Sequence, residues 1–140
     1  MFQTIYAARA LYPMGHPTDA EILATARKRA GQFDLSGFLL RTDQTFIGII
    51  EGQEEVLDCM LARIRLDPRR KLVMTCGPYP VLRRMFPGWS MGYGPKSRDG
   101  FNDAVTTLSP GDLDRHLIVR CLMRVALAQL DDGGQPRVQT

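Results

Sequence analysis

The order of the expected elements predicts an α+β fold of the ferredoxin-like β-α-β-β-α-β type, with a fifth strand and a C-terminal helix. Two observations predict it. Stretches of strand-forming residues alternate with two amphipathic helices in this order. The first and third strands, which this topology places side by side, are apolar on both faces. The two helices would cover one face, so we expect the C-terminal helix to cover the other.

The first strand and the start of the first helix have clear local signals. Residues 2–9 are rich in apolar and β-forming side chains and predict a strand. Pro13, Gly15 and Pro17 indicate a loop after it. Residues 18–21, Thr-Asp-Ala-Glu, form a capping-box pattern in which a Thr side chain and a Glu side chain bond each other's backbone amides. This pattern predicts the start of the first helix.

The middle of the chain predicts two strands followed by the second helix. The first helix carries apolar residues at helical spacing and is expected to end near Gly31. Residues 35–41 and 45–51 have strand composition and are separated by a short polar turn. A second amphipathic helix follows, and Pro68 stops it. These elements complete the first β-α-β-β-α part of the pattern.

The last third predicts two more strands and a helix. Residues 72–76 and 89–93 read as the fourth strand and a short fifth strand. Ser109-Pro110 is a good helix start, because a cap residue precedes proline at the first helical position. It predicts a helix over residues 110–129, followed by a polar tail at 131–140 that is expected to be flexible.

Length and composition indicate one globular domain. The chain has 140 residues, 44% hydrophobic and 24% charged, which is ordinary for a folded domain. We expect a core at residues 1–95, a helical cap of the same domain at 96–130 and a flexible tail at 131–140. No run approaches about 18 apolar residues, so we expect no membrane span.

Cysteine usage and charge narrow the location and the partners. The three cysteines, Cys59, Cys76 and Cys121, form no close pair and follow no secretion signal, so we expect a reducing, cytoplasmic location. Their spacing does not fit a zinc site. The net charge is only +3, and the basic runs Arg69-Arg70-Lys71 and Arg83-Arg84 are expected to be solvated turns, with an anionic partner as the alternative. We do not expect nucleic acid as a partner.

No catalytic pattern occurs, and we do not expect an enzyme. A phosphate loop or paired-carboxylate site is missing from the sequence. His16 and His116 are expected to be surface or packing residues. An acylphosphatase-like enzyme would need an arginine in the loop at residues 11–16, which has none. An RNA-binding ferredoxin-like domain predicts exposed aromatic residues on the central strands, where residues 45–51 offer only Phe46.

Five short motifs lie one after another between residues 2 and 93. They are Ile5-Tyr6, residues 34–37 (Asp-Leu-Ser-Gly), 46–52 (Phe-Ile-Gly-Ile-Ile-Glu-Gly), 63–70 (Arg-Ile-Arg-Leu-Asp-Pro-Arg-Arg) and 86–91 (Phe-Pro-Gly-Trp-Ser-Met). Together they resemble the BLUF family of flavin-binding blue-light sensors, whose corresponding runs include Phe-x-Gln-x-Leu-Glu-Gly, Arg-Ile-x-x-Asp-x-Arg-His and Phe-x-x-Trp-x-Met. The resemblance implies a sensory module with FAD as cofactor.

The resemblance also implies where flavin would lie, which is between the two helices and against the sheet. Tyr6 would take the place of the tyrosine that donates an electron to photoexcited flavin. The remaining implied flavin-binding positions, on the helices and on later strands, are Ile22, Arg29, Ala30, Phe46, Gly48, Ile50, Arg63, Asp67, Trp89 and Met91.

Each of these residues also has a purely structural interpretation. Tyr6 is then a core tyrosine whose hydroxyl bonds the backbone. Arg63 and Asp67, four apart on a helix, are then a surface pair. Trp89 and Met91, which alternate on a strand, are then core residues. The sequence leaves both interpretations open.

Two departures from the family pattern affect the photochemistry. Gly48 stands where the family has the glutamine that bridges tyrosine and flavin, and Ala30, beside Arg29, stands where it has an asparagine that bonds the flavin carbonyl. Neither residue can replace a side-chain amide, which both donates and accepts. No turn requires glycine at position 48, so we expect that position to accept a side chain.

We therefore predict a degenerate BLUF-like sensory or signalling module with weak or absent FAD binding and without the normal photocycle. The alternative is a functional FAD-binding photoreceptor whose hydrogen-bond network is rebuilt from Arg29, Ser90 or water.

The C-terminal helix region suggests a protein partner. Apolar residues occupy much of its girth between Leu117 and Val125, and such a helix needs more than one neighbour to bury them. We expect a homo-oligomer or a partner protein to bind through this region.

Overall fold

In a computed structural model of the protein, the structure describes residues 1–88 and 90–94. The predicted helical cap at 96–130, the tail at 131–140 and Trp89 lie outside the described residues. The elements, in chain order, are β1 (Phe2–Ala10), α1 (Pro17–Phe33), β2 (Ser36–Arg41), β3 (Thr45–Gly52), α2 (Glu54–Arg65), β4 (Arg70–Pro80) and β5 (Ser90–Gly94).

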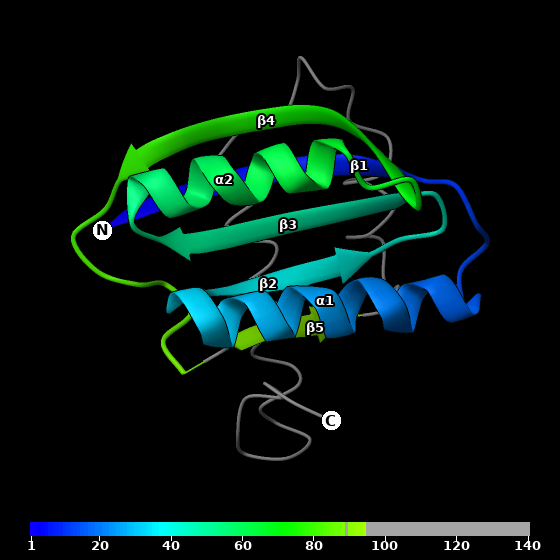
Figure 1. The fold of residues 1–140 in the computed structure, drawn as a ribbon, viewed down its shortest axis with the longest axis horizontal. Helices are drawn as coiled ribbons and strands as arrows, with labels where there is room; N and C mark the ends of the chain where they lie inside the picture. Colours follow the sequence, from blue (N-terminus) through cyan, green and yellow to red (C-terminus); the bar gives the residue numbers. More distant parts are fainter. Residues whose placement is uncertain (89, 95–140) are drawn as a thin grey trace.

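The described elements form a five-stranded mixed sheet with the strand order β4-β1-β3-β2-β5. The pairs β1–β3, β1–β4 and β2–β3 are antiparallel, and β2–β5 is parallel. Both helices lie on the same face of the sheet, with α2 over β1 and β3, and α1 over β2 and β5 (Figure 1). The predicted ferredoxin-like β-α-β-β-α-β topology is confirmed. No helix in the described part is long and apolar enough to cross a membrane.

The start of α1 differs from the prediction. His16 is the N-cap, and its ring Nδ1 accepts a hydrogen bond from the Thr18 backbone amide at 3.1 Å. Pro17 follows at the first helical position, where its missing amide donor costs nothing. The predicted capping box at residues 18–21 is therefore wrong, since Thr18 already lies inside the helix. His16, expected to have no special role, caps the helix.

The fourth strand is longer than the predicted residues 72–76. It runs from Arg70 to Pro80 because it pairs with β1 along that strand's whole length, with two register shifts. β4 forms one edge of the sheet. An edge strand needs hydrogen bonds on one side only, so it tolerates the prolines that mark its end. The extension places Arg70 on the sheet, beside the central strands.

The pairing of the two central strands sorts their side chains as the alternation predicts. Tyr6 lies opposite Gly48, and Ala8 lies opposite Phe46. Tyr6, Ala8 and Phe46 belong to a buried core that also includes residues of both helices. Residues of the other face, such as Ile5 and Ile49, are buried as well. The sheet is therefore apolar and buried on both sides, as predicted.

The ring of Tyr6 lies directly over the backbone of Gly48. A Cβ atom added at Gly48 would be 2.3 Å from the Cε1 and Cζ atoms of Tyr6 and 2.6 Å from its hydroxyl oxygen. Such distances are far below van der Waals contact. The expectation that position 48 accepts a side chain without rearrangement is therefore wrong, because the Tyr6 ring would have to move. Glycine stands there because the neighbouring tyrosine uses the space.

A buried carboxyl group attaches the loop between β4 and β5 to the sheet. Glu51 is fully buried, and its two oxygens accept hydrogen bonds from the backbone amides of Met85 at 2.6 Å and Phe86 at 2.9 Å. The Ser36 hydroxyl donates a third bond at 3.0 Å. These bonds attach the chain that leads into β5 to the sheet, and in β5 the carbonyl oxygen of Met91 accepts a hydrogen bond from Nε of Arg27 in α1 at 3.2 Å.

Substituting Gly48 by alanine should destabilise the protein by about 1–3 kcal/mol, the usual cost of overpacking a core. The matched control is Gly31→Ala, on an exposed turn of α1 where a Cβ meets nothing within 4 Å. It should stabilise the protein by roughly 0.5–1 kcal/mol, because alanine is the better helix former. Urea unfolding measures both. If Gly48→Ala were as stable as wild type, the contact between Tyr6 and Gly48 would not be tight.

Candidate functional site

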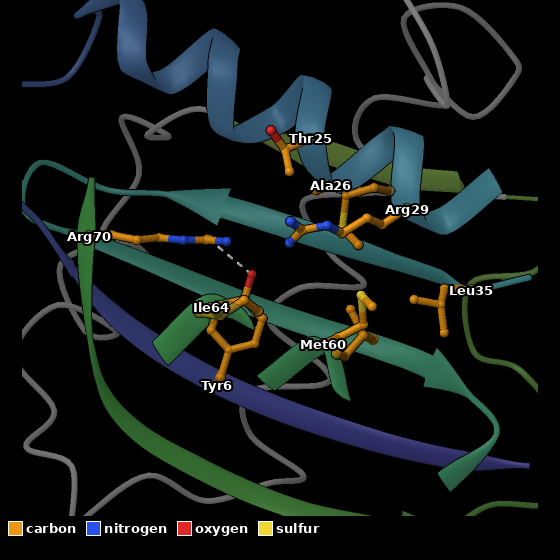
Figure 2. A pocket seen from close by; sticks show the side chains of 10 residues that line it. Tyr6, Thr25, Ala26, Arg29, Leu35, Met60, Ile64 and Arg70 are labelled. Carbon is orange, nitrogen blue, oxygen red and sulfur yellow. Dashed lines mark hydrogen bonds between the residues drawn. The ribbon is translucent and has the colours of Figure 1, made fainter. Parts of the chain in front are cut away.

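A partly open cavity lies between α1, α2 and the sheet, and Figure 2 shows its lining. Its volume is about 30 Å³. Its apolar wall consists of Ala26, Leu35, Ile50, Met60, Ile64 and Met91. Its polar groups come from Tyr6, Thr25, Arg29 and Arg70. The cavity is therefore an apolar slot with a strongly basic side.

Tyr6 and Arg70 are joined at the base of the cavity. Tyr6 points from β1 towards the helices and is 2% exposed. Its hydroxyl accepts a hydrogen bond from Nη1 of Arg70 at 3.2 Å (Figure 2). The guanidinium carbon of Arg70 is also 5.5 Å from the centre of the Tyr6 ring, within the range of a cation–π contact. Arg70 thus fixes both the ring and the hydroxyl.

Arg70 is a buried cation with an incomplete set of partners. It is 6% exposed, and its Nε lies 3.5 Å from an oxygen of Asp67 without forming a hydrogen bond. Asp67 bonds mainly to Arg69, whose Nε and Nη2 donate to its two oxygens at 2.9 and 3.0 Å. Burial raises the pKa of Asp67, but the hydrogen bonds and charge of Arg69, with the charge of Arg70, lower it overall. The Asp67 carboxylate therefore neutralises the charge of Arg69 more directly than that of Arg70.

Arg29 adds a second cation at the cavity. It projects from α1, and its guanidinium points towards that of Arg70 above the Tyr6 hydroxyl (Figure 2). Burial first, and then the charges of Arg63, Arg69 and Arg70, lower the pKa of Arg29, while Asp67 raises it.

The residues proposed from sequence divide into three groups. Tyr6, Arg29, Ile50 and Met91 line the cavity. Ile22, Ala30 and Phe46 are buried in the adjoining core and are not part of the lining. Gly48 lies beneath the Tyr6 ring, Asp67 holds Arg69, and Trp89 lies outside the described residues.

Arg63 does not lie at the cavity. It is exposed, because α2 turns Leu57, Met60 and Ile64 towards the sheet and leaves Arg63 on the other side of the helix. Within this motif, Arg70 is the arginine that lines the cavity. The signal for it was present in the motif at residues 63–70, whose last two positions are Arg-Arg where the family pattern has Arg-His. Sequence spacing alone could not decide which arginine faces inward.

The cavity is small in the structure as it stands. Its volume of about 30 Å³ is enough for about two waters, because one water needs about 10–15 Å³. Among the described residues no Asn or Gln side chain lines the cavity, and the Tyr6 hydroxyl is bonded to Arg70. Nor does any group of three or more His, Cys, Asp or Glu side chains in the described residues form a metal site.

Comparison with known proteins gives consistent matches. Residues 1–92 match the family model BLUF, described as sensors of blue light using FAD. The chain is 33% identical over 88 residues to photoactivated adenylate cyclase subunit beta of Euglena gracilis, and 36% identical over 72 residues to subunit alpha. These matches cover 63% and 51% of this chain, but only 10% and 7% of the cyclase subunits.

Solved structures agree with this assignment. The dark-state structure of BlrB, a BLUF protein, is 26% identical and superposes with a TM-score of 0.70, over 92% of this chain and 96% of BlrB. The photo-activated state of BlsA has the same fold, with a TM-score of 0.70 at 22% identity, over 89% of this chain and 93% of BlsA. The family model covers most of the chain, and the motifs, topology and matches agree: the chain belongs to the BLUF family, whose members sense blue light with FAD.

Proposed function

We propose that this chain is a BLUF-type sensory or signalling module that does not carry out the family's flavin photocycle and has no enzymatic activity of its own. One observation carries the proposal: the Tyr6 ring lies on Gly48 and its hydroxyl is bonded to Arg70. The tyrosine is therefore in place, but its partner is a cation and not an amide.

The chemistry of that partner supports the loss of switching. An amide has a donor and an acceptor end, so its hydrogen bonds can be reversed. A guanidinium only donates. Replacing the amide with the guanidinium of Arg70 therefore leaves Tyr6 with a fixed bond that has no reversed form.

Weak flavin binding is expected from the residues at the two amide positions. An oriented ring in an apolar slot needs a few placed polar groups. Ala30 and Gly48 each remove one, at about 0.5–1.5 kcal/mol per hydrogen bond. Together these losses correspond to roughly a tenfold to a hundredfold weaker affinity.

A second candidate function is a working FAD photoreceptor with a rebuilt network. Arg29 favours it, because its guanidinium lines the cavity and has no hydrogen bond or ion pair within the described residues. In this case Arg29 would donate to a flavin carbonyl.

We also propose that signalling passes through a protein contact of the C-terminal region. The apolar residues between Leu117 and Val125, outside the described part of the chain, support self-association or partner binding.

Titration of the purified protein with FAD should give an affinity weaker than micromolar, and the protein as purified should show no flavin absorption. A submicromolar affinity, or a yellow protein whose spectrum shifts to the red under blue light, would establish the second candidate instead.

Restoring the two side-chain amides tests whether their loss explains the absence of the flavin photocycle. Gly48→Gln with Ala30→Asn should tighten flavin binding and give a red-shifted state under blue light, at a cost in stability of roughly 1–3 kcal/mol because glutamine displaces the Tyr6 ring. Ala30→Asn alone should raise affinity without a light-induced shift, and it should lower stability because Ala30 is 2% exposed in the core. Spectra before and after illumination, with urea unfolding, measure these effects. A folded double variant that binds flavin tightly without a red shift would show that other residues are also missing.

Self-association is tested by sedimentation over a wide range of protein concentration. We expect a concentration-dependent rise in mass, and Leu117→Glu with Leu122→Glu should abolish it. A monomer at all concentrations would exclude self-association and leave a different partner as the only form of this proposal.

A further inference from the structure

Two guanidinium groups face one another across the cavity. Arg29 reaches in from α1 and Arg70 from the start of β4, and both line the cavity (Figure 2). Among the described residues, no carboxyl group belongs to the lining. Asp67 is shared between two arginines: both its oxygens accept hydrogen bonds from Arg69, and its Oδ2 also lies 3.5 Å from Nε of Arg70. The basic side of the cavity therefore carries more positive charge than the described residues neutralise.

Arg70 has an unused donor in a buried place. Its Nε lacks a hydrogen-bond partner although the side chain is almost fully buried. A buried donor without an acceptor is unfavourable, and more so when it belongs to a charged group. A negatively charged group in the cavity would compensate the charge of this guanidinium, which only Asp67, at 3.5 Å from its Nε, approaches within the described residues.

Tyr6 and Arg29 supply two further donors at the same place. The Tyr6 hydroxyl accepts from Arg70, which leaves its own proton free for another acceptor. Arg29 has no hydrogen bond or ion pair in the described part of the chain. Donors from three different elements thus converge on a space that holds about two waters.

We propose that this cavity binds an oxyanion, the carboxylate or phosphate group of a small ligand, between Arg29 and Arg70 with the Tyr6 hydroxyl as a third donor. Guanidinium groups suit such anions because their planar N–H pairs match two oxygens. The cavity takes one anionic group, and the rest of a larger ligand would lie at its open mouth. This rests on the proposed function in one respect, since a tightly bound flavin would occupy the same space.

The test uses the full chain, titrated in separate experiments with inorganic phosphate and with acetate at constant ionic strength, and followed by the NMR signals of the arginine side chains and backbone amides. We expect saturable shifts at Arg29 and Arg70 with at least one of the two ions. Phosphate alone would assign a phosphate group, and acetate alone a carboxylate. Absence of saturable shifts with either ion would overturn the proposal.

Matched variants separate a site from general charge attraction. Arg29→Gln should weaken binding about tenfold or more, because it removes a charge-assisted pair of bonds. Lys28→Gln removes the same charge from the adjacent, exposed position of α1 and should change affinity less than about twofold, as expected for a screened surface charge. Equal effects of the two variants would contradict the site. Arg29 is only half-buried, so its variant is expected to fold.

Tyr6→Phe tests the third donor without removing a charge. It should weaken binding by about threefold to tenfold, the effect of one neutral hydrogen bond. An unchanged affinity would remove the hydroxyl from the site.

A parallel FAD titration keeps the two proposals distinguishable. Tight FAD binding that displaces the anion would overturn the proposed function and leave the anion site standing. Weak FAD binding without anion binding would overturn the site and leave the proposed function standing.

Discussion

The contact between Tyr6 and the bare backbone of Gly48 determines the arrangement of the cavity. The two residues lie opposite one another on the central strands, so the ring can occupy this place only if position 48 has no side chain. From there the hydroxyl reaches Arg70 on the other neighbour of β1. The base of the cavity is thus fixed by three adjacent strands.

Two buried arginines contact Phe46, and their hydrogen-bond partners show which of the two has a purely structural role. Arg41 lies 4.7 Å from the ring of Phe46, bonds Asp19 at 3.2 Å and donates to the carbonyl oxygens of Tyr12 and Thr42 at 2.8 and 2.7 Å. Its charge and donors are satisfied, as a structural buried cation requires. Arg70 lies 5.5 Å from the same ring, but its Nε has no hydrogen bond. That difference makes Arg70 a candidate for ligand binding.

The chain keeps the scaffold of its family. The strand order, the positions of both helices and the tyrosine on β1 fit the family fold, and Gly48 and Ala30 stand where the sequence motifs predict amides. A fold tolerates such exchange because its stability depends on the core, and function depends on a few groups placed upon it. In this chain the cavity carries the basic side chains of Arg29 and Arg70, a type of lining that suits a negatively charged group.

The sequence alone determined the order of strands and helices, the two-sided burial of the sheet and the family. Each depends on local alternation, helical spacing or short motifs, which are properties of contiguous residues. Only the tertiary structure decided that His16 caps α1, that β4 begins at Arg70 and that Arg70 faces the cavity whereas Arg63 faces solvent. Those outcomes depend on which strands pair and in which register, because register sets which side chains from distant segments meet. For the same reason the sequence showed that position 48 is glycine, and only the packing of β1 against β3 showed that Tyr6 requires it.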